Sequence, residues 1–258
     1  MSVRVAKSAG FCFGVSRAVE LVQQAAAAGK RTLTLGPIIH NRHVVEQFAA
    51  AGVRVIDRPE EAGPGDTVVI RSHGVSREVY KRLESTGAEI IDATCPFVKR
   101  IHGLVSQAEA EGRLPVIIGT PTHPEVEGIA GWCGDCRIFD SADALKKWVQ
   151  EEEIGADTPI CMVSQTTSTE SLWKLCRNFA KKQFTNLKIF DTICKATEDR
   201  QTEAASLSRE CQAMVVVGDA KSSNTGRLAM ICREYCDRVA LVDDASELEP
   251  AFFAGITD

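Results

Sequence analysis

The sequence predicts an α/β fold built from three similar lobes, with parallel-type sheets arranged around a pseudo-threefold axis and a central cavity. Two observations support this prediction. Short apolar runs alternate with helix-like segments along the 258 residues, a pattern typical of parallel sheets covered by helices. The same elements also recur at equal distances from Cys12, Cys95 and Cys194, which indicates an internal repeat.

Each repeat begins with a strand, a cysteine and a helix. The predicted strands are 3–6, 88–92 and 187–191, and the predicted helices are 15–29, 98–112 and 197–211. A second strand then closes on a glycine 24 residues after each cysteine, at Gly36, Gly119 and Gly218. Four residues further on stand His40, His123 and Ser222. These offsets place polar groups at the carboxyl ends of strands, where open parallel sheets bind ligands.

The repeats continue with a helix, a short strand, another helix and a last strand. The last strands run into polar loops at 67–74, which contains His73, and at 159–167, which contains Thr166. The third equivalent is expected near 255–265, so we expect a truncated third lobe in a sequence that stops at residue 258. The predicted lobes are 13–95, 96–193, and 194–258 together with 1–12.

Composition narrows the class of protein. The net charge of −5 does not favour binding to nucleic acid or to an anionic membrane, both of which attract basic proteins. The sequence has no apolar run of 18 residues and its first residues lack the apolar core of a signal peptide. We therefore expect a cytoplasmic protein without a membrane partner. Its ten cysteines are then not interpreted as disulfides.

Three cysteines from three repeats can meet on one object. Because Cys12, Cys95 and Cys194 each stand alone in the sequence, they suit an iron–sulfur cluster with three protein ligands and one open iron better than a structural zinc ion. The alternative is three buried structural cysteines. A competing four-cysteine zinc site would combine Cys133 and Cys136 with Cys232 and Cys236, although packing is the favoured interpretation of the last two.

The polar loops predict an anion site. Three imidazoles, from His40, His73 and His123, can face a multiply charged anion such as a diphosphate. Ser222, Ser223 and Asn224 precede a predicted helix and can bind phosphate oxygens, although simple capping explains them equally well.

Glu125 lies two residues after His123 and is a candidate general acid, because a carboxyl in an anion pocket holds its proton longer. The alternative is a first-turn glutamate that favours the helix dipole. Thr166 and Thr167 are candidates for positioning a substrate hydroxyl, or for capping the following helix.

Eight phrases of this sequence together resemble a known family. They are AGFCFGV, GPIIHN, RSHG, DATCPFV, GTPTHPEVEG, VSQTT, DTICKAT and KSSNTGRL, which span residues 9–228 in the family's order. The family is that of the 4-hydroxy-3-methylbut-2-enyl diphosphate reductases, also called IspH or LytB. The resemblance implies a three-lobed α/β fold around an iron–sulfur cavity. It also implies reductive dehydroxylation of the allylic diphosphate to isopentenyl and dimethylallyl diphosphates, the last step of the non-mevalonate pathway.

The resemblance implies roles for individual residues. A 4Fe–4S cluster is expected on Cys12, Cys95 and Cys194. Catalytic roles are expected for Glu125, Thr166 and His123. Substrate contacts are expected from His40, His73, His123, Thr166, Thr167, Ser222, Ser223 and Asn224. The family's further diphosphate-binding serine follows the match to residues 255–258, so the sequence ends before it.

Electrons are expected from ferredoxin or flavodoxin, because no dinucleotide or flavin fingerprint is present in the sequence. Two other classes remain open at this point. One is a protein with structural zinc and a metabolite site, and the other is a phosphate- or RNA-binding module, against which the acidic net charge speaks.

Overall fold

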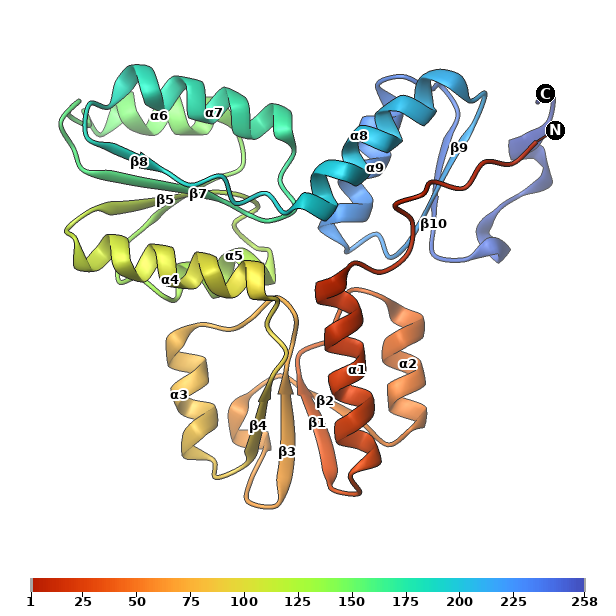
Figure 1. The fold of residues 1–258 in the computed structure, drawn as a ribbon, viewed down its shortest axis with the longest axis horizontal. Coiled ribbons are helices and arrows are strands. Elements are labelled where there is room, and N and C mark those ends of the chain that lie inside the picture. The colour runs from red at the N-terminus through yellow and green to blue at the C-terminus, as the bar shows by residue number, and fades with distance from the viewer. Residues whose placement is uncertain (1, 258) are drawn as a thin grey trace.

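The chain forms three α/β lobes, drawn in Figure 1. The structure is a computed structural model and describes residues 2–257. The first lobe has the strand order β2-β1-β3-β4 and the second has β6-β5-β7-β8. The third has β10 beside β9. Every strand pair is parallel, so the predicted fold class is confirmed.

The elements of each lobe follow the predicted alternation. In the first lobe they are α1 (Phe13–Ala27), β1 (Arg31–Leu35), α2 (Arg42–Ala50), β2 (Arg54–Ile56), η1 (Pro59–Glu61), β3 (Asp66–Ile70), α3 (Arg77–Ser85) and β4 (Glu89–Asp92). In the second they are α4 (Pro96–Ala110), β5 (Leu114–Ile118), α5 (Pro124–Ala130), β6 (Arg137–Phe139), α6 (Ala142–Glu151), β7 (Ile160–Ser164), α7 (Glu170–Gln183) and β8 (Leu187–Ile189). In the third they are α8 (Lys195–Glu210), β9 (Met214–Val217), α9 (Ser223–Arg233), β10 (Val239–Val242) and the single-turn helices η2 (Ala245–Glu247) and η3 (Pro250–Phe253).

The central strands are buried on both faces. All five residues of β3 are buried, and so are all five of β7, which explains the unbroken apolar stretches 68–70 and 160–163 within them. Along β3, Val69 packs with α1 and α2 while Val68 packs with Leu83 of α3. Each strand side therefore contacts a different helical layer, and the core lies in the lobes around the central cavity.

The repeat is visible in individual hydrogen bonds. The glycine after the second strand of each unit donates its N–H to the same place in the neighbouring strand: Gly36 to Ile56 O at 2.8 Å, Gly119 to Phe139 O at 2.9 Å and Gly218 to Val242 O at 2.8 Å. The equal sequence offsets thus correspond to equal backbone positions.

The segment 3–6, predicted as a strand, is not one in the structure. It runs beside α8 instead, where Arg4 pairs with Glu210 and the Glu203 carboxylate accepts the N–H groups of Lys7 and Ser8. Among residues 2–257 the outer edge of β9 is unpaired, but part of the cavity lies between β9 and this segment, since Val3, Val5 and Val217 all line it. The segment therefore does not join the sheet.

The predicted last strand of the third unit is also wrong for the part that the structure describes. Residues 250–253 form η3, and residues 254–257 contain a turn at Gly255. The remainder of that prediction, at Asp258 and beyond, lies outside the described residues.

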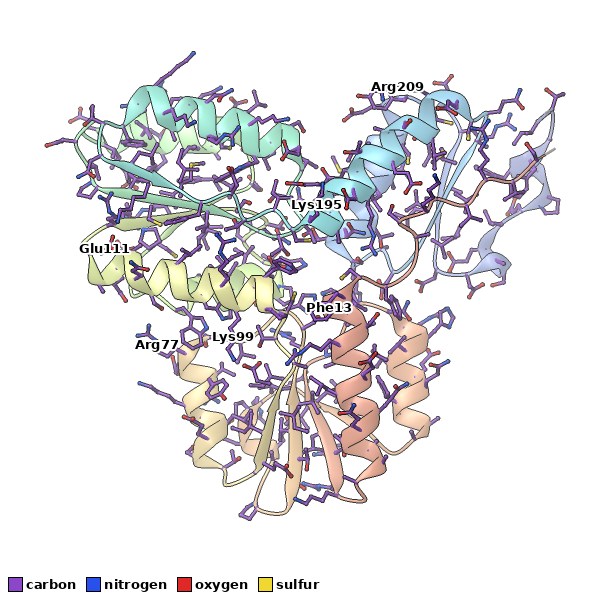
Figure 2. All side chains as sticks on the ribbon, in the orientation of Figure 1. Phe13, Arg77, Lys99, Glu111, Lys195 and Arg209 are labelled. Carbon is purple, nitrogen blue, oxygen red and sulfur yellow. The ribbon has the colours of Figure 1, made fainter. Side chains whose placement is uncertain are left out.

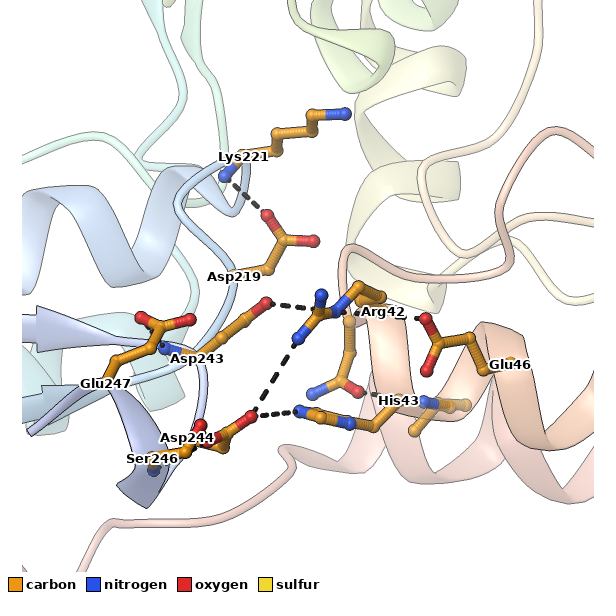
Figure 3. A network of polar contacts seen from close by, with 11 residues as sticks. Arg42, His43, Glu46, Asp219, Lys221, Asp243, Asp244, Ser246 and Glu247 are labelled. Atoms are coloured by element: carbon orange, nitrogen blue, oxygen red, sulfur yellow. Dashed lines mark hydrogen bonds and ion pairs between the residues drawn. The ribbon is translucent and has the colours of Figure 1, made fainter.

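Charged side chains join the first and third lobes at the rim of the cavity. Figure 3 shows Arg42 and His43 of α2 facing Asp243 and Asp244, which follow β10. Arg42 lies 3.6 Å from Asp243 and 3.8 Å from Asp244, and His43 Nε2 lies 3.5 Å from Asp244. These side chains are partly exposed, so we expect them to orient the lobes more than to stabilise them.

No helix in residues 2–257 is both long enough and apolar enough to cross a membrane.

Candidate functional site

A cavity of about 880 Å³ lies where the three lobes meet. Its wall includes every site residue predicted from the sequence: Cys12, His40, His73, Cys95, His123, Glu125, Thr166, Thr167, Cys194, Ser222, Ser223 and Asn224. It extends outward between the N-terminal segment and β9. The ends of the repeated strands therefore do supply one common site, as parallel-sheet geometry requires.

Each of the three lone cysteines is the N-cap of a helix. Cys12 precedes α1, Cys95 precedes α4 and Cys194 precedes α8. Figure 2 shows Phe13 and Lys195, the first residues of α1 and α8, near the middle of the molecule, whereas Arg209 at the far end of α8 lies at the periphery. Three helix N-termini thus point at the cavity, and their partial positive charge favours negative groups there.

The first two cysteines are in close reach of each other. Gly14 follows Cys12 by two residues, and a Cβ placed on it would lie 2.6 Å from the sulfur of Cys95. Only glycine fits at this point, because real Cβ atoms do not approach another heavy atom so closely. Cys12 also acts electrostatically on the thiols of both Cys95 and Cys194.

Two of the cysteines are hydrogen-bonded through their backbone N–H groups to the predicted polar loops. The N–H of Cys95 donates to Ser72 O at 2.9 Å, next to His73, and the N–H of Cys194 donates to Thr166 O at 3.0 Å. Burial raises the pKa of the Cys95 and Cys194 thiols, and nearby N–H groups partly oppose it. A bound metal would reverse that tendency, because metals bind the thiolate.

The three predicted histidines form one cluster. Their ring centroids lie 4.7 Å apart for His40 and His73, 5.4 Å for His73 and His123, and 5.8 Å for His40 and His123. Burial lowers the pKa of all three, and that of His123 falls to about 4. They are therefore neutral at pH 7 and supply hydrogen bonds rather than charge.

A backbone N–H group fixes which ring nitrogen of His123 carries the proton. Its Nδ1 accepts the N–H of Glu125 at 3.1 Å, so the neutral ring carries its proton on Nε2 and is a donor there. His40 Nε2 and His73 Nδ1 are buried without a hydrogen-bond partner among residues 2–257. Each of the three rings has one nitrogen within 4.8 Å of the others, which suits either an anion or a metal ion, and the donor nitrogen of His123 favours the anion.

Glu125 is held by a single residue. The N–H of Thr166 donates to one carboxylate oxygen at 2.6 Å, and its hydroxyl donates to the other at 2.8 Å. Glu125 is 3% exposed, and this burial raises its pKa, in the direction that we expected. Glu125 also lies in the first turn of α5, together with the exposed Glu127, so its position is compatible with the helix-dipole alternative as well.

Ser223 lies at the centre of a group of donors. Its Oγ lies 2.9 Å from Thr167 Oγ1, 3.1 Å from Arg227 Nε and 3.3 Å from Gln165 Nε2. A hydroxyl oxygen has two lone pairs and one hydrogen. Three donors exceed its accepting capacity, so at least one O–H or N–H bond in this group is free to turn toward a ligand.

The structure shows which of the predicted serines and threonines cap a helix. Ser222 is the N-cap of α9 and accepts the N–H of Thr225, so it combines a capping role with its place in the cavity wall. The cap of α7 is Thr169, not Thr166 or Thr167. The two threonines therefore remain available to the cavity.

Three polar residues near the site were missed by the sequence analysis. Gln165 is fully buried and also accepts the N–H of Thr120. Arg71 and Arg227 are half-buried behind the histidines and Ser223. Gln165, Arg71 and Arg227 belong to the motifs VSQTT, RSHG and KSSNTGRL, which would have been the signal to include them.

The competing zinc site is not assembled. Cys133 and Cys136 lie beside α5 and β6 in the second lobe, whereas Cys232 and Cys236 lie in and after α9 in the third. In residues 2–257, the histidine trio is the cluster whose ligand atoms are close enough to hold one ion.

Known proteins resemble this chain over nearly its whole length. Curated 4-hydroxy-3-methylbut-2-enyl diphosphate reductases include one from Thermoanaerobacter sp. (strain X514), 40% identical over 253 residues, which covers 96% of this chain and 86% of the relative. Another, from Pelobacter propionicus, is 39% identical and covers 99% of this chain and 89% of the relative.

Solved structures give the same result. One described as (E)-4-hydroxy-3-methyl-but-2-enyl diphosphate reductase, the terminal enzyme of the non-mevalonate pathway, matches with a TM-score of 0.70 and 36% identity over 98% of this chain and 89% of its own. The E-1-hydroxy-2-methyl-but-2-enyl-4-diphosphate reductase from Plasmodium falciparum matches with a TM-score of 0.88 and 25% identity, over 95% of this chain and 77% of its own.

The family model described as LytB protein matches residues 3–258. Together with the convergence of the eight motifs on one cavity, this match shows that the chain belongs to the LytB family.

Proposed function

We propose that this chain is a 4-hydroxy-3-methylbut-2-enyl diphosphate reductase that acts in the non-mevalonate route to isoprenoids. The reaction breaks the allylic C–O bond, forms a C–H bond and releases water, so it consumes two electrons and two protons. The products are isopentenyl and dimethylallyl diphosphates. The observation that carries the proposal is that all twelve predicted residues, from three lobes, line a single cavity.

The diphosphate would lie between the histidines and the start of α9. The Nε2–H of His123 and the free nitrogens of His40 and His73 can donate to its oxygens. Ser223 and Asn224, with Ser222 and Thr167 beside them, offer hydroxyl and amide groups at a helix N-terminus. This donor set holds the substrate in one orientation, which can contribute a large part of the rate.

Glu125 would supply the proton for the departing hydroxyl. Its buried carboxyl holds a proton more readily than an exposed one. When Glu125 is protonated, it can donate to Thr166 Oγ1, and the hydroxyl hydrogen of Thr166 is then free to face the substrate. Thr166 thereby positions the substrate hydroxyl and relays the proton.

Cys12, Cys95 and Cys194 fit the iron–sulfur cluster expected of this family. Three thiols from three helix N-termini line one cavity, and the glycine at position 14 leaves room against the Cys95 sulfur. When bound, a 4Fe–4S cluster would supply the two electrons singly and an open iron as Lewis acid. We propose ferredoxin or flavodoxin as the electron donor.

We also propose the lobe boundaries expected from the repeat, with residues 13–95, 96–193, and 194–258 plus 1–12 as three units, so that Cys12, Cys95 and Cys194 lie at the three junctions between units. The sheet memberships and the contact of segment 3–8 with α8 support this division.

The test is an anaerobic turnover assay with the allylic diphosphate and a reduced viologen dye as the donor. We expect both five-carbon diphosphates as products. Cys95→Ser should remove the cluster absorbance and the activity while the chain stays folded, whereas Cys133→Ser, outside the cavity, should retain both. Cluster-loaded protein that releases neither product would refute the proposal, and full activity in Cys95→Ser would refute the ligand assignment.

A further inference from the structure

Two half-buried arginines stand behind the wall of the cavity. Arg71 directly follows β3 and precedes Ser72 and His73, and Arg227 lies in the first turns of α9. No ion pair found within residues 2–257 includes either guanidinium. Burying a cation without a close anion costs free energy, so both arginines are in unfavourable positions unless a ligand brings negative charge.

Arg227 contacts the donors around Ser223. Its Nε lies 3.1 Å from Ser223 Oγ. The same guanidinium acts electrostatically on Glu125 and on His123. It is therefore close enough to both the proposed acid and Ser223 to influence each of them.

Arg71 occupies the corresponding place behind the histidines. Its guanidinium packs against Gly36, where a Cβ would lie 2.8 Å from Nη1. Its hydrogen bond is a long one, from Nε to Gly74 O at 3.5 Å. Electrostatically it acts on all three rings, those of His40, His73 and His123. The carboxylate that acts on it most is Glu127, which is exposed.

The charge of these arginines matters because, among the described residues, no lysine or arginine lines the part of the cavity formed by the histidines and Ser223. The cations of the wall, Arg4 and Arg200, lie beside the N-terminal segment and α8. The three histidines are neutral, and the serines, threonines and amides around them are uncharged. A diphosphate ester brings about three negative charges when it is fully ionised, and hydrogen bonds alone do not compensate them in a buried site. Burial lowers the pKa of both arginines, yet arginine stays protonated at neutral pH.

We propose that Arg71 and Arg227 are the cations that compensate the diphosphate, acting through the neutral side chains that touch it. Arg71 polarises the histidine cluster from one side. Arg227 orients Ser223, and through it Thr167, from the other. Both are positioning residues, and neither is among the residues of the cavity wall in the structure. This inference rests on the proposed function only in its choice of anion.

The test compares anion affinities of the anaerobic, cluster-loaded protein by titration calorimetry, with inorganic diphosphate and inorganic phosphate as probes. Arg71→Met and Arg227→Met should each weaken diphosphate binding at least about tenfold, since a hydrogen-bonded charge contributes on that scale. The loss should be smaller for phosphate, which carries less charge. Arg71→Lys and Arg227→Lys, which retain the cation, should recover most of the affinity.

Arg113→Met provides the matched control. Arg113 is also a half-buried arginine, but it sits at the far end of the second sheet, where it contacts Glu111, Ile160 O and Asn186 O. Its diphosphate affinity should stay within about twofold of the wild type. If a Met variant fails to fold, the Gln variant replaces it, because Gln keeps a polar group without the charge.

The results separate this inference from the proposed function. If the wild type binds diphosphate but does not reduce the allylic substrate, the proposed function fails, and the arginine variants still decide the inference. If the Met variants bind diphosphate as tightly as the wild type, or lose phosphate and diphosphate equally, the inference is overturned. It is also overturned if the wild type does not bind diphosphate or if lysine restores nothing. In turnover, the expected change is a raised KM for the diphosphate substrate with a smaller change in kcat.

Discussion

At the scale of single residues, the paired bonds between Thr166 and Glu125 give the clearest mechanistic prediction. Glu125→Gln preserves the shape and most hydrogen bonds of the side chain but removes the transferable proton. We expect kcat to fall by about 10²–10⁴ with little change in substrate affinity, the usual range for a lost general acid. Single-turnover kinetics and a binding titration measure the two quantities.

The control is Glu127→Gln, which alters the exposed glutamate two residues further along the same helix. It should leave kcat unchanged. An unchanged kcat in Glu125→Gln would remove Glu125 from the proton path.

His102 gives a pH prediction away from the cavity. It is 4% exposed and stacks on Trp132 with centroids 5.1 Å apart, and burial lowers its pKa from 6.5 to about 4. The unfolded chain therefore takes up this proton at a higher pH than the folded chain. The associated stability is present above pH 6.5 and is lost as the pH falls toward 4.

The free energy of unfolding of the wild type should fall between about pH 7 and about pH 5. In His102→Phe we expect this fall to be smaller by roughly 2 kcal/mol. Urea unfolding followed by tryptophan fluorescence measures it. The same slope in His102→Phe and in the wild type would contradict the account.

The sequence allowed the residues that face the cavity to be predicted, because their motifs recur at fixed offsets and match a family pattern. Arg71 and Arg227 escaped because an arginine in a single sequence normally indicates an exposed position. Arg71 is buried against Gly36 and Gly74 of its own lobe, and Arg227 lies against Ser223 in α9. These contacts show only in the folded chain, although both arginines lie inside the quoted motifs.

At the scale of elements, the N-terminal turns of α1, α4 and α8 place the thiols. Gly14→Ala should disturb this arrangement, since its Cβ would lie 2.6 Å from the Cys95 sulfur. We expect the iron content per chain to fall by more than about half, although alanine is the better helix former. Iron analysis after anaerobic purification measures the effect.

Gly103→Ala is the matched change inside α4, where an added Cβ would meet no atom within 4 Å. It should keep full iron content and raise the free energy of unfolding by about 0.5–1 kcal/mol. Equal iron content in Gly14→Ala and the wild type would show that iron binding does not require the close approach of α1 to Cys95.

The positions of helices and strands could be predicted where the sequence pattern is local. The prediction failed where a strand depends on pairing with a distant segment. The buried strands β3 and β7 and the capped helices follow from apolar runs and turn residues. Segment 3–6 has the composition of a strand, but in the described residues the cavity separates it from β9, so it has no strand to pair with.

At the scale of the whole molecule, three lobes of the same design surround one cavity. One cysteine caps the first helix of each lobe, α1, α4 or α8, and all three cysteines line the central cavity. The threefold plan could be predicted from the repeat offsets. The relative placement of the lobes could not, because it depends on contacts such as those of Arg42 with Asp243 and Asp244, which are visible only in the folded chain.

The most direct test of the central claim is iron and acid-labile sulfide analysis of the anaerobically purified wild-type chain. Three thiols that share one cluster predict a brown protein with about four irons and four sulfides per chain. Folded and active protein with zinc and no sulfide, or with no metal at all, would contradict the account.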